Sequence, residues 1–94
     1  MSDTIVVTRH AALVQYLIEQ GLVSASVSVI THATPDDVRD KHVIGVLPLS
    51  LAALAASVTE VPLILPAELR GHELTLEQVR AHARPVATYH VAVV

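Results

Sequence analysis

The chain has no cysteine, and this absence removes several kinds of chemistry at once. Disulfide bonds, a thiolate nucleophile and a cysteine-ligated zinc site are all excluded. Tryptophan and phenylalanine are also missing, and the only tyrosines are Tyr16 and Tyr89. Binding of nucleic acid by stacking bases along a row of aromatic side chains is therefore not expected.

Positive charge is scarce as well. Six Lys and Arg residues stand against nine Asp and Glu residues, which gives a formal net charge of -3. Long DNA or RNA is held through many contacts between basic side chains and phosphates, so no long nucleic-acid partner is expected. A small anionic ligand, held by two or three local positive groups, remains compatible with this composition.

Long apolar runs are absent, although hydrophobic residues make up 52% of the chain. No run reaches the ~20 residues that cross a bilayer. Asp3 and Arg9 fall where a secretory signal would have its apolar core. We therefore expect a cytoplasmic protein without a membrane partner.

Residues 1–94 are predicted to form a single domain. A domain this small buries a modest fraction of its surface. The excess of Val, Leu and Ala then favours burial of apolar surface between two copies of the chain, and a homodimer is the commonest closed assembly.

Five short runs rich in Val or Ile predict β-strands. The first three are almost continuously apolar, which is typical of strands covered on both faces in a parallel sheet. The last run alternates more, which indicates an edge strand or one that faces a partner subunit. The predicted strands are residues 4–8, 26–31, 42–47, 61–65 and 86–93.

Helical patterns separate these runs. Residues 11–20 carry apolar side chains at helical spacing, and Gly21 supplies the stop. Ser50 is expected to cap a third helix over residues 51–58, which is apolar nearly all round and therefore predicted to be buried.

Two capping boxes mark the other helix starts. Thr34 is followed by Pro35 at the first helical position and by Asp37, and Thr75 is followed by Gln78. Leu74 can pack on Val79 beside the second box, and Pro85 ends that helix. The alternation predicts an α/β fold of small Rossmann-like, doubly wound type, with a mainly parallel five-stranded sheet and helices on both faces.

Polar and basic side chains follow the predicted strands at their carboxyl ends. Thr8, Arg9 and His10 follow the first strand, and Thr31 and His32 end and follow the second. Ligands of such folds bind at this edge of the sheet, where strand order reverses. Arg offers a planar fork of donors for phosphate or carboxylate, and His can move a proton near neutral pH.

Two further segments are candidates for the same edge. Pro48 and Ser50 precede the third helix, and Arg70 and Gly71 follow the fourth strand. The structural alternatives remain open: Arg9 or Arg70 pairs with an acid, His10 and Ser50 only cap helices, and Thr31 only shapes a turn.

A metal site is not expected despite six histidines. No HxxxH or HExxH spacing occurs, and no GxSxG motif supports a serine triad. No cofactor is implied.

Four stretches together resemble a known family. In order they are TRHAALVQYLIEQG, VITH, VIGVLPLSLAA and LPAELRGHEL, and the similarity runs from about Thr4 to about Val79. Their order and spacing resemble small CRISPR-associated Csx-type proteins of type III systems, a Rossmann-like, CARF-related group proposed to act as ring nucleases.

This resemblance implies degradation of a cyclic oligoadenylate, usually cyclic tetra-adenylate, by a metal-independent homodimer that binds the ring across its two-fold axis. It carries over Arg9 and His10 as catalytic candidates and His32 and Arg70 as ligand-binding candidates, with Pro48 and Gly71 shaping the pocket. A non-catalytic sensor or sponge, an assembly protein and a metal-dependent RNase are the alternatives.

Overall fold

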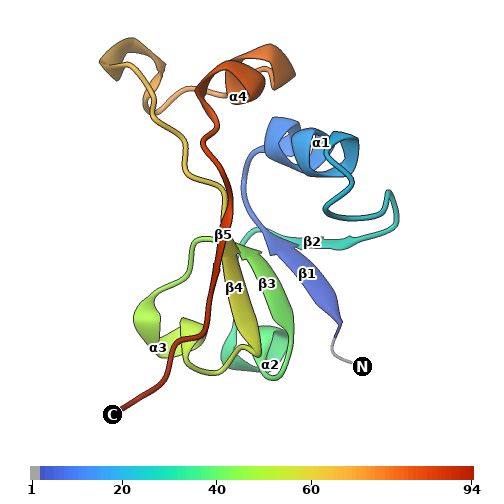
Figure 1. Cartoon of the computed structure of the whole chain (residues 1–94), viewed down its shortest axis with the longest axis vertical. Coiled ribbons are helices and arrows are strands. Elements are labelled where there is room, and N and C mark those ends of the chain that lie inside the picture. Colours follow the sequence, from blue (N-terminus) through green and yellow to red (C-terminus); the bar gives the residue numbers. More distant parts are fainter. Residues whose placement is uncertain (1–2) are drawn as a thin grey trace.

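Four parallel strands and one antiparallel strand form a single sheet (Figure 1). The computed structural model describes residues 3–94. The strands are β1 (Thr4–Val7), β2 (Ser28–Ile30), β3 (His42–Gly45), β4 (Ser57–Glu60) and β5 (Ala87–Tyr89). The helices are α1 (Ala11–Glu19), α2 (Pro35–Val38), α3 (Leu49–Ala52) and α4 (Leu76–His82), with a 3₁₀ turn, η1 (Ala67–Leu69).

The strand order is β2-β1-β3-β4-β5. From β1 the chain first winds outward to β2, and it later returns to the other side of β1 with β3. The strand order therefore reverses between β1 and β3, and in open α/β sheets the carboxyl ends of two such strands flank the ligand-binding crevice. The antiparallel β5 lies at one edge, which confirms the edge-strand interpretation of the last run.

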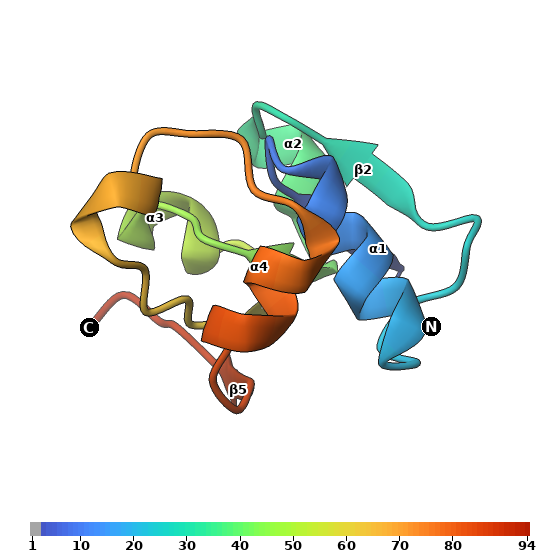
Figure 2. The same cartoon turned by 90° about the horizontal axis from the view of Figure 1, so that it is seen from above.

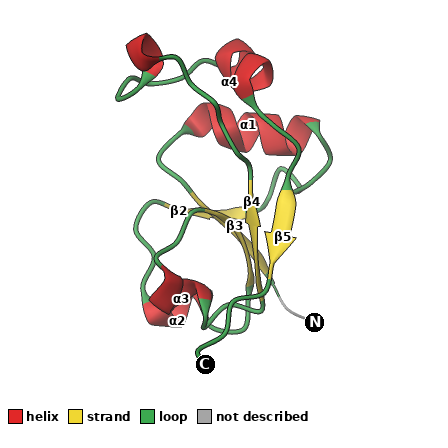
Figure 3. Cartoon of the chain, turned by 60° about the vertical axis from the view of Figure 1, so that its left-hand side comes forward, coloured by secondary structure: helices red, strands yellow, loops and turns green. Residues whose placement is uncertain are grey.

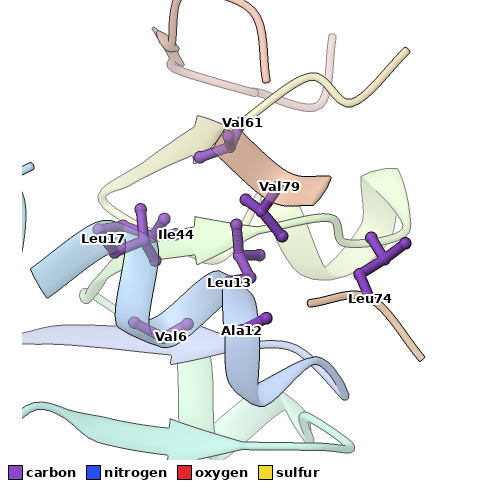
Figure 4. Close-up of a cluster of buried hydrophobic side chains, with 8 residues drawn as sticks. All are labelled: Val6, Ala12, Leu13, Leu17, Ile44, Val61, Leu74 and Val79. Carbon is purple, nitrogen blue, oxygen red and sulfur yellow. The ribbon is translucent and has the colours of Figure 1, made fainter. Parts of the chain in front are cut away.

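Helices cover both faces of the sheet (Figure 3). Helices α1 and α4 lie side by side on one face (Figure 2) and enclose a core that includes Val6, Leu17 and Val79 (Figure 4). Helices α2 and α3 cover the other face, where Val38 and Val43 are fully buried. The predicted small Rossmann-like, doubly wound fold is confirmed. No helix within residues 3–94 has the length and apolar character needed to span a membrane.

The two predicted capping boxes are present. The Asp37 carboxylate accepts hydrogen bonds from the Thr34 N–H at 2.8 Å and from its hydroxyl at 2.9 Å. These bonds hold the pKa of Asp37 below its ordinary value. At α4 the Gln78 N–H donates to Thr75 Oγ1 at 3.2 Å. Gly21 follows α1 with φ +73°, as its predicted role as the stop requires.

The third helix is where the sequence interpretation was wrong. Helix α3 begins after Pro48 and ends at Ala52, so Ser50 lies inside it and is not its cap. The expected helical residues 57 and 58 instead belong to β4, where Val58 pairs with Val43. A β-branched residue gains more from that buried place beside β3 than from a helix in which its side chain is restricted.

The fourth strand was also placed too late. Residues 61–65 leave the sheet, and only Leu63 forms an isolated bridge, to Ala83. Pro62 and Pro66 cannot donate to a β-ladder, so this segment cannot continue the sheet. It runs on to η1, which projects beyond the sheet near α4 (Figure 1).

Candidate functional site

The turn from β1 into α1 is fixed by two hydrogen bonds. The Thr8 N–H donates to the Ile30 carbonyl at 3.0 Å, which extends the pairing of β1 with β2. The Thr8 hydroxyl accepts from the His10 N–H at 3.1 Å. His10 immediately precedes α1 in an extended conformation. Thr8 is thus held beside the start of the helix, with Arg9 exposed between them.

A pocket of about 300 Å³ opens at this turn. Its polar lining comes from Thr8, Arg9 and His10 after β1 and from Thr31 after β2, so the structure brings these four predicted residues together. The end of β3 supplies Gly45 and Val46. The pocket therefore lies at the carboxyl ends of β1 and β3, where the strand order reverses. Aliphatic side chains complete the wall: Leu13, Val61 and Leu63.

Within residues 3–94, the side chains of Arg9 and His10 form no hydrogen bond or ion pair that holds the fold. Within residues 3–94 the Arg9 guanidinium has no ion pair, and the His10 side chain makes no capping hydrogen bond to α1. Arg9 is therefore not paired with an acid, and His10 occupies the N-cap position of α1 without using its side chain. Both side chains remain available to an anion, and the N–H groups at the start of α1 favour negative charge at the same place.

Gly45 permits the close approach of β3 to β1 beside the pocket. Its φ is +143°, and a Cβ at this position would overlap the Val7 carbonyl oxygen. Only glycine therefore fits here without distortion. The sequence interpretation did not single out Gly45, although an isolated glycine within an apolar strand indicates such a close approach.

A second pocket, of about 250 Å³, adjoins the first and contains two more of the predicted residues. His32 and Pro48 line it, and it shares Val7, Thr31 and Val46 with the first pocket. His32 is exposed. These two residues thus lie beside the Arg9 pocket, on the side toward α2 and α3.

Three predicted site residues lie elsewhere. Ser50, Arg70 and Gly71 are exposed and line neither pocket. Arg70 ends η1, and Gly71 makes the following turn with φ +80°. The expectation of one common rim that includes Arg70 is therefore not met within this chain. Pro62 and Pro66 prevent the segment after β4 from continuing the sheet, and Arg70 follows that segment.

A larger pocket lies at the opposite ends of the strands. It measures about 460 Å³ and is lined by Asp3, Lys41 and several serine side chains near the amino ends of β1 and β2. Ligands of open α/β sheets bind at the carboxyl ends of the strands, so we place the candidate site at the Arg9 pocket. Within residues 3–94 no three His, Asp or Glu side chains are grouped so that they could hold a metal ion.

Comparison with known families supplies the remaining observation. One family model matches residues 5–92, and its description is "Putative CRISPR-associated protein (Cas_VVA1548)". The chain belongs to this family. The match confirms the CRISPR-associated part of the resemblance, and it covers β1 through β5 together with the candidate site. No curated protein and no solved structure matches the chain.

Proposed function

We propose that this CRISPR-associated chain is a metal-independent ring nuclease that cleaves cyclic tetra-adenylate and so switches off type III CRISPR signalling. The observation that carries the proposal is the pocket at the strand-order reversal. It presents Arg9 and His10 free of partners within residues 3–94, next to the hydroxyls of Thr8 and Thr31. A relationship to CARF-type domains is part of the same proposal.

The ligand suits this pocket chemically. Each linkage of a cyclic oligoadenylate carries one negative charge. Arg9 can bind such a phosphate through two parallel N–H donors. An RNA linkage also carries its own nucleophile, the adjacent 2′-hydroxyl. The protein then has to align this oxygen with phosphorus and the departing 5′-oxygen, and good alignment alone can supply up to ~7–11 kcal/mol.

The reaction balances without a metal. The 2′-oxygen gives its proton to a water molecule and attacks phosphorus, the bond to the 5′-oxygen breaks, and the 5′-oxygen takes a proton. Arg9 neutralises the charge that develops on the phosphoryl oxygens, and His10 donates the proton to the leaving oxygen. General acid catalysis of this kind contributes ~10²–10⁴-fold. Two such cuts yield linear di-adenylates that end in a 2′,3′-cyclic phosphate.

A homodimer is the proposed active form. Two chains would present two copies of Arg9 and His10 to a ring of four phosphates, which matches the symmetry of the ligand. His32 and Pro48 would contact the neighbouring nucleotides. In a dimer, Ser50, Arg70 and Gly71 are proposed to contact the part of the shared ring that lies over the partner's pocket.

Substitution of Arg9 tests the proposal. Purified protein is incubated with cyclic tetra-adenylate in excess EDTA, and products are separated by chromatography. The wild type should release linear di-adenylate, and Arg9→Ala should cut at least about 100-fold more slowly because charge in the transition state is no longer neutralised. Arg84→Ala is the matched control, since Arg84 is also exposed and lines neither pocket.

The outcomes are distinct. An unchanged rate for a folded Arg9→Ala, with circular dichroism like that of the wild type, would contradict the role of Arg9. Cleavage that EDTA abolishes would point to a metal-dependent RNase instead.

A sensor or sponge is the second candidate, and one observation favours it. The described lining of the Arg9 pocket contains no carboxylate, and His10 is assigned as the acid, so no side chain of that pocket is left to accept the proton of the 2′-hydroxyl. The same chromatography decides between the two functions: an intact ring that stays bound means a sensor or sponge, and a new linear product means a nuclease.

A further inference from the structure

A third pocket, of about 270 Å³, lies on the side of the candidate site toward β5. Val46, Leu49 and Val91 give it apolar walls, and Tyr89 adds an aromatic ring. Glu60 and His90 are its ionisable groups. Such a lining, mostly apolar with a few polar groups, is typical of pockets that hold small organic ligands.

The wall that carries Tyr89 is tied to the sheet. Tyr89 pairs with Val58 of β4 in the antiparallel ladder, and the hydroxyls of Thr59 and Thr88 are joined by a hydrogen bond of 2.8 Å. The Tyr89 side chain nevertheless remains 53% exposed. It therefore offers an accessible ring on a fixed strand, and a flat heterocycle can stack on such a ring.

Glu60 gives the pocket its hydrogen-bonding character. Within residues 3–94 its carboxylate has neither an ion pair nor a hydrogen bond from a side chain. An ionised carboxylate only accepts hydrogen bonds, so it prefers a ligand that donates. The exocyclic amine of adenine is such a donor.

The third pocket adjoins the Arg9 pocket at the end of β3. Both are lined by Gly45 and Val46, and the Val46 side chain is 74% exposed between them. A nucleotide laid across Val46 would place its phosphate at Arg9 and its base against Tyr89. We propose that the pocket formed by Tyr89 and Glu60 is the adenine-binding subsite of this protein, an inference that rests on the proposed function for the identity of the ligand.

Titration with mononucleotides tests the subsite separately from ring cleavage. Adenosine 5′-monophosphate is added to isotope-labelled protein, and NMR shifts are followed at Tyr89 and Val91. Tyr89→Ala should weaken binding roughly 5- to 100-fold, the range given by loss of one base–aromatic stack. Tyr89→Phe keeps the ring and should bind like the wild type. Val29→Ala, an exposed change on the opposite edge strand β2, is the control for nonspecific effects.

The role of Glu60 is tested by removing one group from the ligand. Purine riboside 5′-monophosphate has the same rings as adenosine 5′-monophosphate but lacks the amine. The wild type should prefer the adenosine compound by about tenfold or more, because a hydrogen bond to a charged group is lost. Glu60→Leu should abolish that preference, and Glu77→Gln on α4 should keep it.

The possible results distinguish failure of the adenine subsite from failure of the nuclease proposal. If the wild type cleaves the ring and Tyr89→Ala cleaves and binds equally well, the subsite is wrong and the nuclease stands. If adenosine 5′-monophosphate binds at Tyr89 but the ring stays intact, the subsite stands and the nuclease is wrong. Stronger shifts with guanosine 5′-monophosphate, or shifts confined to other residues, would overturn the adenine assignment.

Discussion

Single residues decide how closely β1 and β3 can approach at the candidate site. Thr8, Arg9 and His10 directly follow β1. At the end of β3, Gly45 lies beside Val7 of β1. Because Gly45 has no side chain, the end of β3 can lie directly against the Val7 carbonyl at the end of β1. The missing Cβ of Gly45 therefore sets the close approach of β3 to β1 beside the pocket.

We predict that Gly45→Ala destabilises the protein more than an alanine at another glycine of positive φ. Gly21→Ala is the matched control, because Gly21 has φ +73° and a Cβ there would meet nothing within 4 Å. That control should cost about 1–2 kcal/mol of unfolding free energy from backbone strain. Gly45→Ala should cost a further ~1–3 kcal/mol, because its methyl group overlaps the Val7 carbonyl. Urea unfolding measures both, and equal losses would contradict the prediction.

At the scale of elements, an ion pair joins the two helices on one face of the sheet. The Arg80 guanidinium of α4 donates to both carboxylate oxygens of Glu19 at the end of α1, with Nε 2.9 Å from Oε2. The hydrogen bonds from Arg80 lower the pKa of Glu19 below its ordinary value of 4.5, and those to Glu19 raise the pKa of Arg80. Both side chains are partly exposed, so salt should weaken the contact.

The lowered pKa of Glu19 predicts a pH dependence of stability. A carboxyl group with a lowered folded-state pKa stabilises the fold above its unfolded value of about 4.5, and this contribution is lost as the pH falls through the folded-state pKa. Glu19→Gln should therefore unfold at lower urea than the wild type at pH 7, and the difference should shrink below pH 4.5. A difference that persists in strong acid would show that the effect does not come from the charge of Glu19.

At the scale of the whole molecule, one chain holds only part of the proposed ring-binding surface. Arg9, His10, Thr31 and His32 lie in adjoining pockets, whereas Arg70 lies beyond the sheet. Several large apolar side chains are also exposed, among them Val46 and Leu49, which are 74% and 75% exposed. Exposed apolar surface of this kind is typical of contacts with a ligand or another chain.

The proposed dimer predicts one ring for every two chains. Native mass spectrometry of a His10→Ala variant with cyclic tetra-adenylate should show a dimer with a single ring bound, because the variant lacks the proton donor, cuts slowly and retains Arg9. The free protein should already sediment as a dimer in analytical ultracentrifugation. One ring on each monomer would contradict the shared site.

Local features whose causes lie within a few residues could be predicted from the sequence. Helix starts at Thr34 and Thr75 and the stop at Gly21 were predicted correctly, because a cap depends on neighbours three or four positions away. The apolar runs of β1 and β3 likewise identified the centre of the sheet. From these followed the α/β class and the grouping of Thr8, Arg9 and His10 with Thr31.

Contacts between distant parts of the chain fix which segment forms β4 and where Arg70 lies. Residues 57–60 join the sheet because Val58 finds a place beside Val43, a contact between residues fifteen positions apart that no local pattern encodes. The segment after β4 then leaves the sheet, and Arg70 lies at the end of that segment. The same distant pairings create the pocket of Tyr89 and Glu60, because β5 returns from the end of the chain to lie against β4.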